Sequence, residues 1–500
     1  MKGIKKYVFV WCIGLVMLGS CTKSLPPQLK VIPGDALFVV ALDNRQLFTK
    51  GGLDRMKDFK SYQMFQREIN RGDDETKKMM EGLLEKPQSF GIDMKKAYLF
   101  GYEGRRDVAV AVVFKMDNVK RFEDRVQELT GSNDQLSVED KGAYKIVETY
   151  GFAVAWNKDL LIAGTESDKF DQLMNQPKGN SIVSNSDFVN FHSGSYDAGL
   201  WMSYGKIFDK AMSHSGMQKS PVLSDMKKMN MHVYLNFNQG EVTLSGEMTP
   251  KSEVKDFFSK YPVMKSDFDK NILRAFPDQS YLTIKQSIDL QSYLKMLKDM
   301  DSTFDQIMKD PDARTLINGL GGDFLLSVYG FEQGDFPVPM AGLGFNVQSK
   351  AVFDKLLELA SMEMYDMIIP KDNYYEVSNR MMNISLYFAF KDNVIFVTTD
   401  KEAIIAFTEK GQKRPMSASA SNFYVNLDID SYPKEARNFL YNEMGVSASD
   451  VSKYMKPFKE FRIDVDKDFK TVVTLKLSNR ENSLKQILTY FDEIAADRFN

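Results

Sequence analysis

Three histidines are the residues with the clearest capacity for metal chemistry. His192, His214 and His232 are all the histidine in the 500 residues, so a His-rich centre would need all three to converge. They lie far apart in the sequence, and His192 and His214 occupy polar segments that contain Ser and Gly. We therefore predict no metal site.

Four aspartates recur at the ends of predicted strands and could support general acid–base chemistry. They are Asp43, Asp289, Asp428 and Asp430. Helix capping explains the first equally well, because Asp43 and Gln46 have the spacing of a capping box, in which the two side chains satisfy free backbone N–H groups. We predict a capping role rather than catalysis.

Motifs with a known catalytic spacing are absent from the sequence. It contains no HExxH, CxxC or GxSxG segment and no Walker loop. The glycine-rich segment Asn318–Gly322 precedes a predicted strand, whereas a dinucleotide fingerprint links a strand to the helix that follows it. We predict a turn there, no cofactor and no enzymatic activity.

The N-terminus has the pattern of a lipoprotein export signal. Three lysines precede the apolar run Tyr7–Leu18, whose 12 residues are too few to span a bilayer as a helix. The segment Leu18-Gly-Ser-Cys21 resembles a lipobox. We predict a signal peptide over residues 1–20, lipidation of Cys21 by acyl chains such as palmitate, and a tether over residues 21–30. Cys12 would leave with the signal, so no free thiol would remain.

Charge and sorting signals narrow the location. The chain has 65 basic and 68 acidic residues, a net charge of −3, and removal of the leader with its three lysines would make it −6. Because a nucleic-acid binder normally shows a basic excess, we predict that none is bound. No Asp follows Cys21 directly, and the first acid is Asp35. By resemblance to known sorting rules, the anchor is expected in the outer membrane facing the periplasm, with surface exposure as the alternative.

The sequence contains an internal repeat of one unit. Pro33–Asp43 is echoed by Pro277–Asp289, and Tyr98–Glu103 is echoed by Ser327–Glu332. Later predicted strands correspond in the same order, at offsets of about 224 to 244 residues. This order favours a tandem duplication over a chance likeness of β-β-α patterns.

The duplication sets the predicted domains. The first α+β repeat covers residues 31–272 and the second covers residues 273–500. In each repeat a capping box is expected to begin a helix, at Thr165 in the first and at Thr399 in the second.

Strands are predicted mostly as hairpins with alternating apolar residues. Val233, Leu235 and Phe237 are an example, and such alternation indicates antiparallel sheets with one face covered. Amphipathic helices follow the hairpins. The predicted fold class is α+β, a tandem duplication of a domain built from antiparallel β-hairpins with helices packed on one sheet face.

Methionine and phenylalanine are frequent, at 29 and 36 residues. Methionine is common on adaptable hydrophobic surfaces, so the Met-rich segments 226–231 and 362–369 could line a pocket for an acyl chain. The alternative, which we favour, is that these side chains fill the core of two medium-sized domains.

The export signal, Leu18-Gly-Ser-Cys21, the segment Ile32–Asp43 and the two-copy layout resemble one family. It is an uncharacterised group of Bacteroidota lipoproteins known as domain of unknown function 4836. The resemblance covers nearly the whole chain, and it implies lipidation of Cys21 without implying an activity.

Three functions stay open at this point. The first is an outer-membrane lipoprotein with a non-enzymatic binding or structural role in the cell envelope, which has an envelope protein as a possible partner and contacts the membrane through lipidated Cys21. The second is a periplasmic carrier or sensor of an apolar, lipid-like ligand, which would use the concave face of the antiparallel sheets. The third is a hydrolase with an unrecognised site, which we consider the weakest because no catalytic motif supports it.

Overall fold

The computed structural model describes residues 25–69, 87–105, 107–131, 137–149, 151–212, 221–265, 267–300, 304–332, 338–363, 367–379, 384–409, 412, 415–416, 419–433 and 455–498. Cys21, the signal over residues 1–20 and His214 lie outside these residues. In the described part of the chain, no helix is both long and apolar enough to cross a membrane. The chain forms two compact units, the first from residues 1–36 and 82–190 and the second from residues 37–81 and 191–500.

The first unit contains a six-stranded antiparallel sheet among its described residues. The strand order is β2 (Ile92–Glu103), β3 (Val108–Met116), β7 (Leu160–Gly164), β6 (Phe152–Trp156), β5 (Lys145–Thr149) and β4 (Val138–Asp140). Its helical segments are η1 (Pro27–Lys30), η3 (Pro87–Phe90), α5 (Val119–Gly131), η4 (Ser167–Lys169), α6 (Phe170–Asn175), η5 (Lys178–Asn180) and η6 (Ile182–Ser184), and α7 (Ser186–His192) follows them. Helix α5 packs on the sheet through Phe122, whose ring meets Trp156 edge-on at 5.2 Å.

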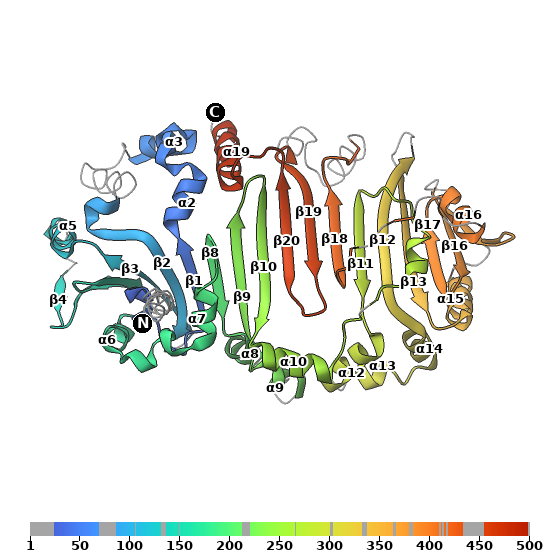
Figure 1. Cartoon of the computed structure of the whole chain (residues 1–500), viewed down its shortest axis with the longest axis horizontal. Coiled ribbons are helices and arrows are strands. Elements are labelled where there is room, and N and C mark those ends of the chain that lie inside the picture. Colours follow the sequence, from blue (N-terminus) through green and yellow to red (C-terminus); the bar gives the residue numbers. More distant parts are fainter. Residues whose placement is uncertain are drawn as a thin grey trace, which may run out of the picture. The chain divides into compact units, whose positions relative to one another are not determined.

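The second unit contains a longer antiparallel sheet of fourteen described strands, in which each strand is hydrogen-bonded to its neighbour in space (Figure 1). The order is β1 (Phe38–Asp43), β8 (Ala198–Met202), β9 (Asn230–Phe237), β10 (Glu241–Thr249), β20 (Thr471–Leu477), β19 (Phe458–Val465), β18 (Phe423–Asp428), β11 (Leu282–Ser287), β12 (Leu320–Glu332), β13 (Val338–Val347), β17 (Val394–Thr398), β16 (Ile384–Lys391), β15 (Tyr375–Asn379) and β14 (Ile368–Pro370). The antiparallel strands and the helices around them confirm the predicted α+β class.

Strands β10 and β20 join two stretches of this sheet that come from distant parts of the chain. Leu244 lies opposite Val473 at the middle of that pairing. Outward from it, one side runs β9, β8, β1 and the other runs β19, β18, β11, so the last strand of each predicted repeat meets its counterpart. This is the order that a duplication would produce, and the repeat boundaries at 31–272 and 273–500 stay a prediction.

Helices of the second unit gather near the ends of the strands. Figure 1 places α8 (Tyr204–Met212), α9 (Pro221–Met226), α10 (Lys251–Lys260), α12 (Leu290–Met300), α13 (Phe304–Ile307) and α14 (Pro311–Gly319) at one end. At the other end are α2 (Asn44–Gly51), η2 (Leu53–Asp58), α3 (Lys60–Ile69) and α19 (Ser483–Arg498). Met226 and Met229 pack into the core between α9, α10 and α12, so in this segment methionine fills the core.

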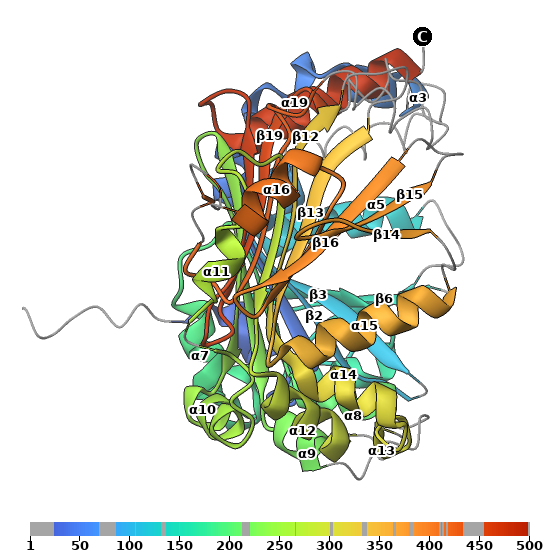
Figure 2. The ribbon, with the colours of Figure 1, turned by 90° about the vertical axis from the view of Figure 1, so that its right-hand side faces the viewer.

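Both faces of the sheet are covered near β13, β17 and β16. Helices α11 (Lys270–Leu273) and α16 (Lys401–Glu409) pack on the face that carries Leu325 and Phe396. Helix α15 (Lys350–Glu363) packs on the opposite face, against Phe345 and Ile395. Figure 2 shows α15 and α14 on the other side of the strands from α11 and α16.

Candidate functional site

Three of the four aspartates predicted at strand ends act as helix or turn caps. The carboxylate of Asp43 accepts a hydrogen bond from Gln46 N at 3.0 Å and a second from the Gln46 side chain at 3.3 Å. Asp289 and Asp428 accept from the backbone N–H groups three residues later, at 2.7 and 3.0 Å. Asp430 is tied through its backbone, whose N–H donates to Lys459 O. The carboxylates of Asp43, Asp289 and Asp428 are therefore placed to stabilise chain turns.

The capping boxes predicted at Thr165 and Thr399 were wrong. Helix α16 is capped by the next residue, Asp400, whose Oδ1 accepts from the N–H groups of Glu402 and Ala403 at 2.9 and 3.2 Å. Thr399 instead donates its hydroxyl to Pro339 O at 2.6 Å. Thr165 likewise bonds to a neighbouring strand, since its Oγ1 accepts a hydrogen bond from Val110 N in β3.

The histidines do not form a metal site in the described residues. His232 is buried in β9, where Nε2 lies 3.1 Å from Thr249 Oγ1. His192 lies at the C-terminal end of α7, and no group of three or more potential metal ligands was found in the described ranges.

The glycine-rich segment Asn318–Gly322 joins α14 directly to β12. Gly322 has a φ of +89°, and a Cβ there would lie only 2.2 Å from Ile288 O. The glycine therefore serves a close approach between two backbone segments, in place of the turn predicted from the sequence.

The central strands of the second unit carry an apolar face that is left partly exposed. In an antiparallel sheet, residues directly opposite each other point to the same side. One row across eight strands, from β9 to β13, consists of Leu235, Leu244, Val473, Ile463, Val425, Ile284, Leu326 and Leu343. The row beside it consists of Phe237, Val242, Leu475, Phe461, Leu427, Leu282 and Val328. We call these two rows the apolar face.

Every side chain of the apolar face keeps part of its surface accessible. Leu244 and Leu343 are 39% and 37% exposed, and the others are intermediate. In the described part of the chain, helices reach this side of the sheet at its margins, where α15 packs near β13 and α10 and α12 form a core with Met248 (Figure 2). Contiguous exposed apolar surface of this kind marks a binding site more often than an ordinary surface.

The opposite side of the same strands is polar. Its matching row consists of Asn236, Thr243, Thr474, Arg462, Asn426, Thr283 and Ser327. Ion pairs cross this side, with Lys476 Nζ 2.6 Å from Glu460 and Arg462 Nε 2.9 Å from Asp464. Antiparallel sheets usually bury the apolar face and solvate the polar one. The alternation predicted a covered face, and the structure differs because no helix crosses the centre of the apolar face among the described residues.

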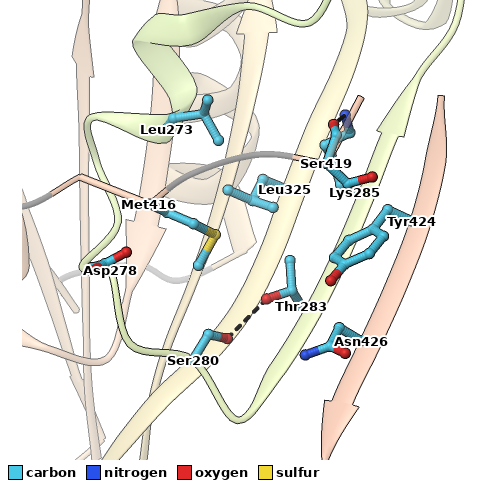
Figure 3. A pocket seen from close by; sticks show the side chains of 10 residues that line it. All are labelled: Leu273, Asp278, Ser280, Thr283, Lys285, Leu325, Met416, Ser419, Tyr424 and Asn426. Atoms are coloured by element: carbon cyan, nitrogen blue, oxygen red, sulfur yellow. Dashed lines mark hydrogen bonds between the residues drawn. The ribbon is translucent and has the colours of Figure 1, made fainter. Parts of the chain in front are cut away.

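A small polar cavity lies on the polar side, where β11 meets β18. Its volume is about 150 Å³, and its lining includes Thr283, Lys285, Tyr424 and Asn426. In Figure 3 the Tyr424 hydroxyl, Thr283 and Asn426 lie close together, while Lys285 reaches toward Ser419 at another part of the lining. Burial lowers the pKa of the Lys285 ammonium below its usual value, while Asp323 and Asp464 act in the opposite direction. Burial likewise raises the pKa of the Tyr424 hydroxyl.

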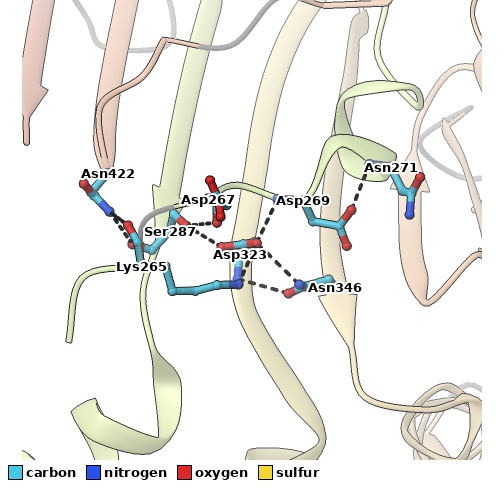
Figure 4. A network of polar contacts seen from close by, with 8 residues as sticks. All are labelled: Lys265, Asp267, Asp269, Asn271, Ser287, Asp323, Asn346 and Asn422. Carbon is cyan, nitrogen blue, oxygen red and sulfur yellow. Dashed lines mark hydrogen bonds and ion pairs between the residues drawn. The ribbon is translucent and has the colours of Figure 1, made fainter. Parts of the chain in front are cut away.

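A buried carboxylate, Asp323, fixes the strands next to that cavity (Figure 4). It accepts from Lys265 Nζ at 2.9 Å, from Ser287 Oγ at 2.6 Å and from Asp269 N at 2.9 Å. Asn346 donates its side-chain amide to the same carboxylate at 3.4 Å. The network therefore ties β11, β12 and β13 to the segment that leads into α11.

Comparison with known proteins assigns the chain to a family. The family model of a domain of unknown function, DUF4836, matches residues 29–484. The chain belongs to this family. No curated protein matches it.

Two solved structures of one protein show a distant likeness. Crystal form IV of TP0453 is 13% identical, with 45% of this chain and 82% of that chain covered, at a TM-score of 0.26. Crystal form I of TP0453 is 10% identical, with 49% and 90% covered, also at a TM-score of 0.26. Scores this low carry no argument about function.

Sequence reasoning placed the alternating strands correctly but missed the open apolar face. The signal was present, because Val233, Leu235 and Phe237 alternate with polar residues in a strand. Whether a helix covers such a face depends on packing between distant segments, which a local pattern does not encode. The Met-rich segments were predicted mainly to fill the core, with a pocket for an acyl chain as the alternative, and the two rows of the apolar face contain no methionine.

Proposed function

We propose that this protein is a non-enzymatic, lipid-anchored binding protein of the cell envelope, and that its apolar face holds the acyl chains of a lipid-like ligand. Anchoring through Cys21 in the outer membrane, facing the periplasm, would place this face beside a supply of such chains. The observation that carries the proposal is the pair of apolar rows, which run across eight and seven strands without a buried member.

The composition of the apolar face favours acyl chains over a folded protein partner. Tyr, Trp, Phe, Met and Arg are enriched in protein interfaces, and Tyr, Trp and Arg dominate their energetics. The two rows contain two Phe and none of the other four, and the rest are Leu, Val and Ile. A flexible hydrocarbon chain needs contact area without hydrogen-bond partners, and these side chains provide it.

The dimensions of the apolar face also suit this ligand. Eight strands at about 4.8 Å spacing span roughly 34 Å. One leaflet of hydrocarbon is about 15 Å thick, so the face has room for an extended chain and for a second beside it. Each methylene withdrawn from water contributes about 0.8 kcal/mol, so about ten of them supply about 8 kcal/mol, which corresponds to a micromolar Kd before the cost of ordering is subtracted.

A matched pair of substitutions on one strand tests the proposal. Leu244→Asp places a charge within the apolar face, whereas Ser245→Asp places the same charge at the next residue, on the polar side. The form that begins at residue 22 would be delipidated and titrated with cis-parinaric acid, a fluorescent fatty acid. We expect saturable binding that Leu244→Asp weakens at least about tenfold, the scale expected for burying an unpaired charge, and that Ser245→Asp leaves unchanged.

Two results would count against acyl-chain binding. One is the absence of saturable binding by the parent protein, and the other is an equal loss in both variants. The structural or protein-binding role predicted from the sequence would then become the better hypothesis. Hydrolysis has little support, since Asp43, Asp289 and Asp428 serve as caps.

A further inference from the structure

Lys285 is a buried lysine whose charge faces the small polar cavity. It lies in β11 and is only 3% exposed. Its Nζ donates to Ser419 O at 2.6 Å and lies 4.9 Å from the centre of the Phe268 ring. Both partners are neutral, so these contacts orient the ammonium without neutralising its charge.

Several other partly buried lysines of the second unit have a carboxylate partner, although Lys391 donates to the backbone carbonyls of Phe407, Thr408 and Glu409. Lys265 lies 2.9 Å from Asp323 and Lys50 lies 2.7 Å from Asp197. Among the described residues, no carboxylate lies within 4 Å of Lys285 Nζ. Asp464, which acts on it from farther away, is engaged by Arg462 and Ser421. A buried charge without a counterion is costly, so an anion in the cavity would be stabilised.

The cavity offers further polar groups at the side of Lys285. Tyr424 also lines the cavity, and it lies directly opposite Lys285 in the pairing of β11 with β18. Asn426 Oδ1 is buried and accepts no hydrogen bond from the described residues. Thr283 already donates to Ser280 at 2.9 Å. The lining of the cavity therefore includes a cation in Lys285, a hydroxyl donor in Tyr424 and an acceptor without a donor in Asn426 Oδ1 (Figure 3).

We propose that this cavity binds a small hydroxy- or amino-substituted monocarboxylic acid. The carboxylate would meet Lys285 and Tyr424, and the hydroxyl or amino group would donate to Asn426 Oδ1. A volume of about 150 Å³ corresponds to roughly five water molecules, which limits the ligand to a few carbons. One cation balances one carboxylate, whereas a phosphate would leave excess negative charge near Asp278 and Asp464. The site lies on the opposite side of the sheet from the apolar face, so it does not depend on the proposed function.

Calorimetric titration of the full chain in detergent tests the proposal, with lactate as the ligand. Propionate, which lacks the hydroxyl, and inorganic phosphate are the comparison ligands. We expect lactate to bind one to one, propionate more weakly, and phosphate not at all. Lys285→Met should weaken lactate binding by about tenfold to a hundredfold, the usual scale for a hydrogen bond to a charged group. Tyr424→Phe should weaken it less.

Lys476→Met is the matched control, because Lys476 lies on the same side of the sheet and is paired with Glu460. It should leave lactate binding unchanged. Lys285→Met should melt no lower than the parent, since it removes an unpaired buried charge, and this separates loss of the site from loss of the fold. Absence of lactate binding, equal binding by phosphate, or an equal effect of Lys285→Met and Lys476→Met would overturn the proposal.

Discussion

Removal of the Asp323 carboxylate is the perturbation for which the structure gives the clearest magnitude. The side chain is 1% exposed and accepts from Lys265, Ser287, Asp269 and Asn346. Breaking a buried pair by removing one partner typically costs about 3–5 kcal/mol. Lys265 is 28% exposed and would regain some water, so Asp323→Ala should cost about 3 kcal/mol, at the lower end of that range. Asp323→Asn keeps one acceptor and should cost about half as much.

Hydrogen exchange is the suitable assay, because a chain with two compact units need not unfold in one step. A loss of about 3 kcal/mol corresponds to roughly a hundredfold faster exchange in peptides from β11 and β12. Asp354→Ala is the control, since Asp354 is 53% exposed and pairs with Lys350 one helical turn away, where such pairs contribute about 0.5 kcal/mol or less. If both variants exchanged at similar rates, the reasoning about a buried carboxylate node would be refuted.

Two further predictions concern the ends of the chain. Burial raises the pKa of Asp492, but hydrogen bonds from Ser61 and Lys60 outweigh it and hold the pKa below its usual 3.8. The ionised Asp492 carboxylate therefore stabilises the folded chain above about pH 3.8, and this stabilisation is lost as the pH falls through the lower pKa of the folded state. Exchange in α3, corrected for intrinsic rates, should accelerate between about pH 5 and about pH 3, and Asp492→Asn should remove that dependence; an unchanged dependence would contradict it. Cys21→Ala should abolish labelling by radioactive palmitate and release the protein from the membrane fraction, whereas retained label would show that another site is acylated.

Local patterns were sufficient for much of the fold. Alternation of Val233, Leu235 and Phe237 predicted strand β9, and the strand β10 that follows it pairs with it as a hairpin. The spacing of Asp43 and Gln46 predicted a cap that the structure confirms. These features depend on residues a few positions apart, so the sequence contains all the information that they require.

Features that depend on distant segments were not predictable in the same way. The pairing of β10 with β20 joins residues more than two hundred positions apart. Lys285 lies among alternating residues whose polar side would ordinarily be solvated, yet it is buried beside Ser419 and Phe268. Thr399 and Asp400 are adjacent, and either side chain could cap helix α16. Thr399 donates to Pro339 O instead, so Asp400 is the cap. In each case tertiary packing outweighed the local signal.

The pairing of β10 with β20 also has a consequence for how the protein is made. Strand β10 is complete by residue 249, whereas its partner begins at residue 471. During synthesis, the backbone N–H and C=O groups along that edge would have no native partner while about 220 further residues emerge. An unpaired strand edge is a template for misassembly, and contacts between such distant segments form slowly. A holding chaperone would therefore be most useful in that interval, before β20 closes the sheet.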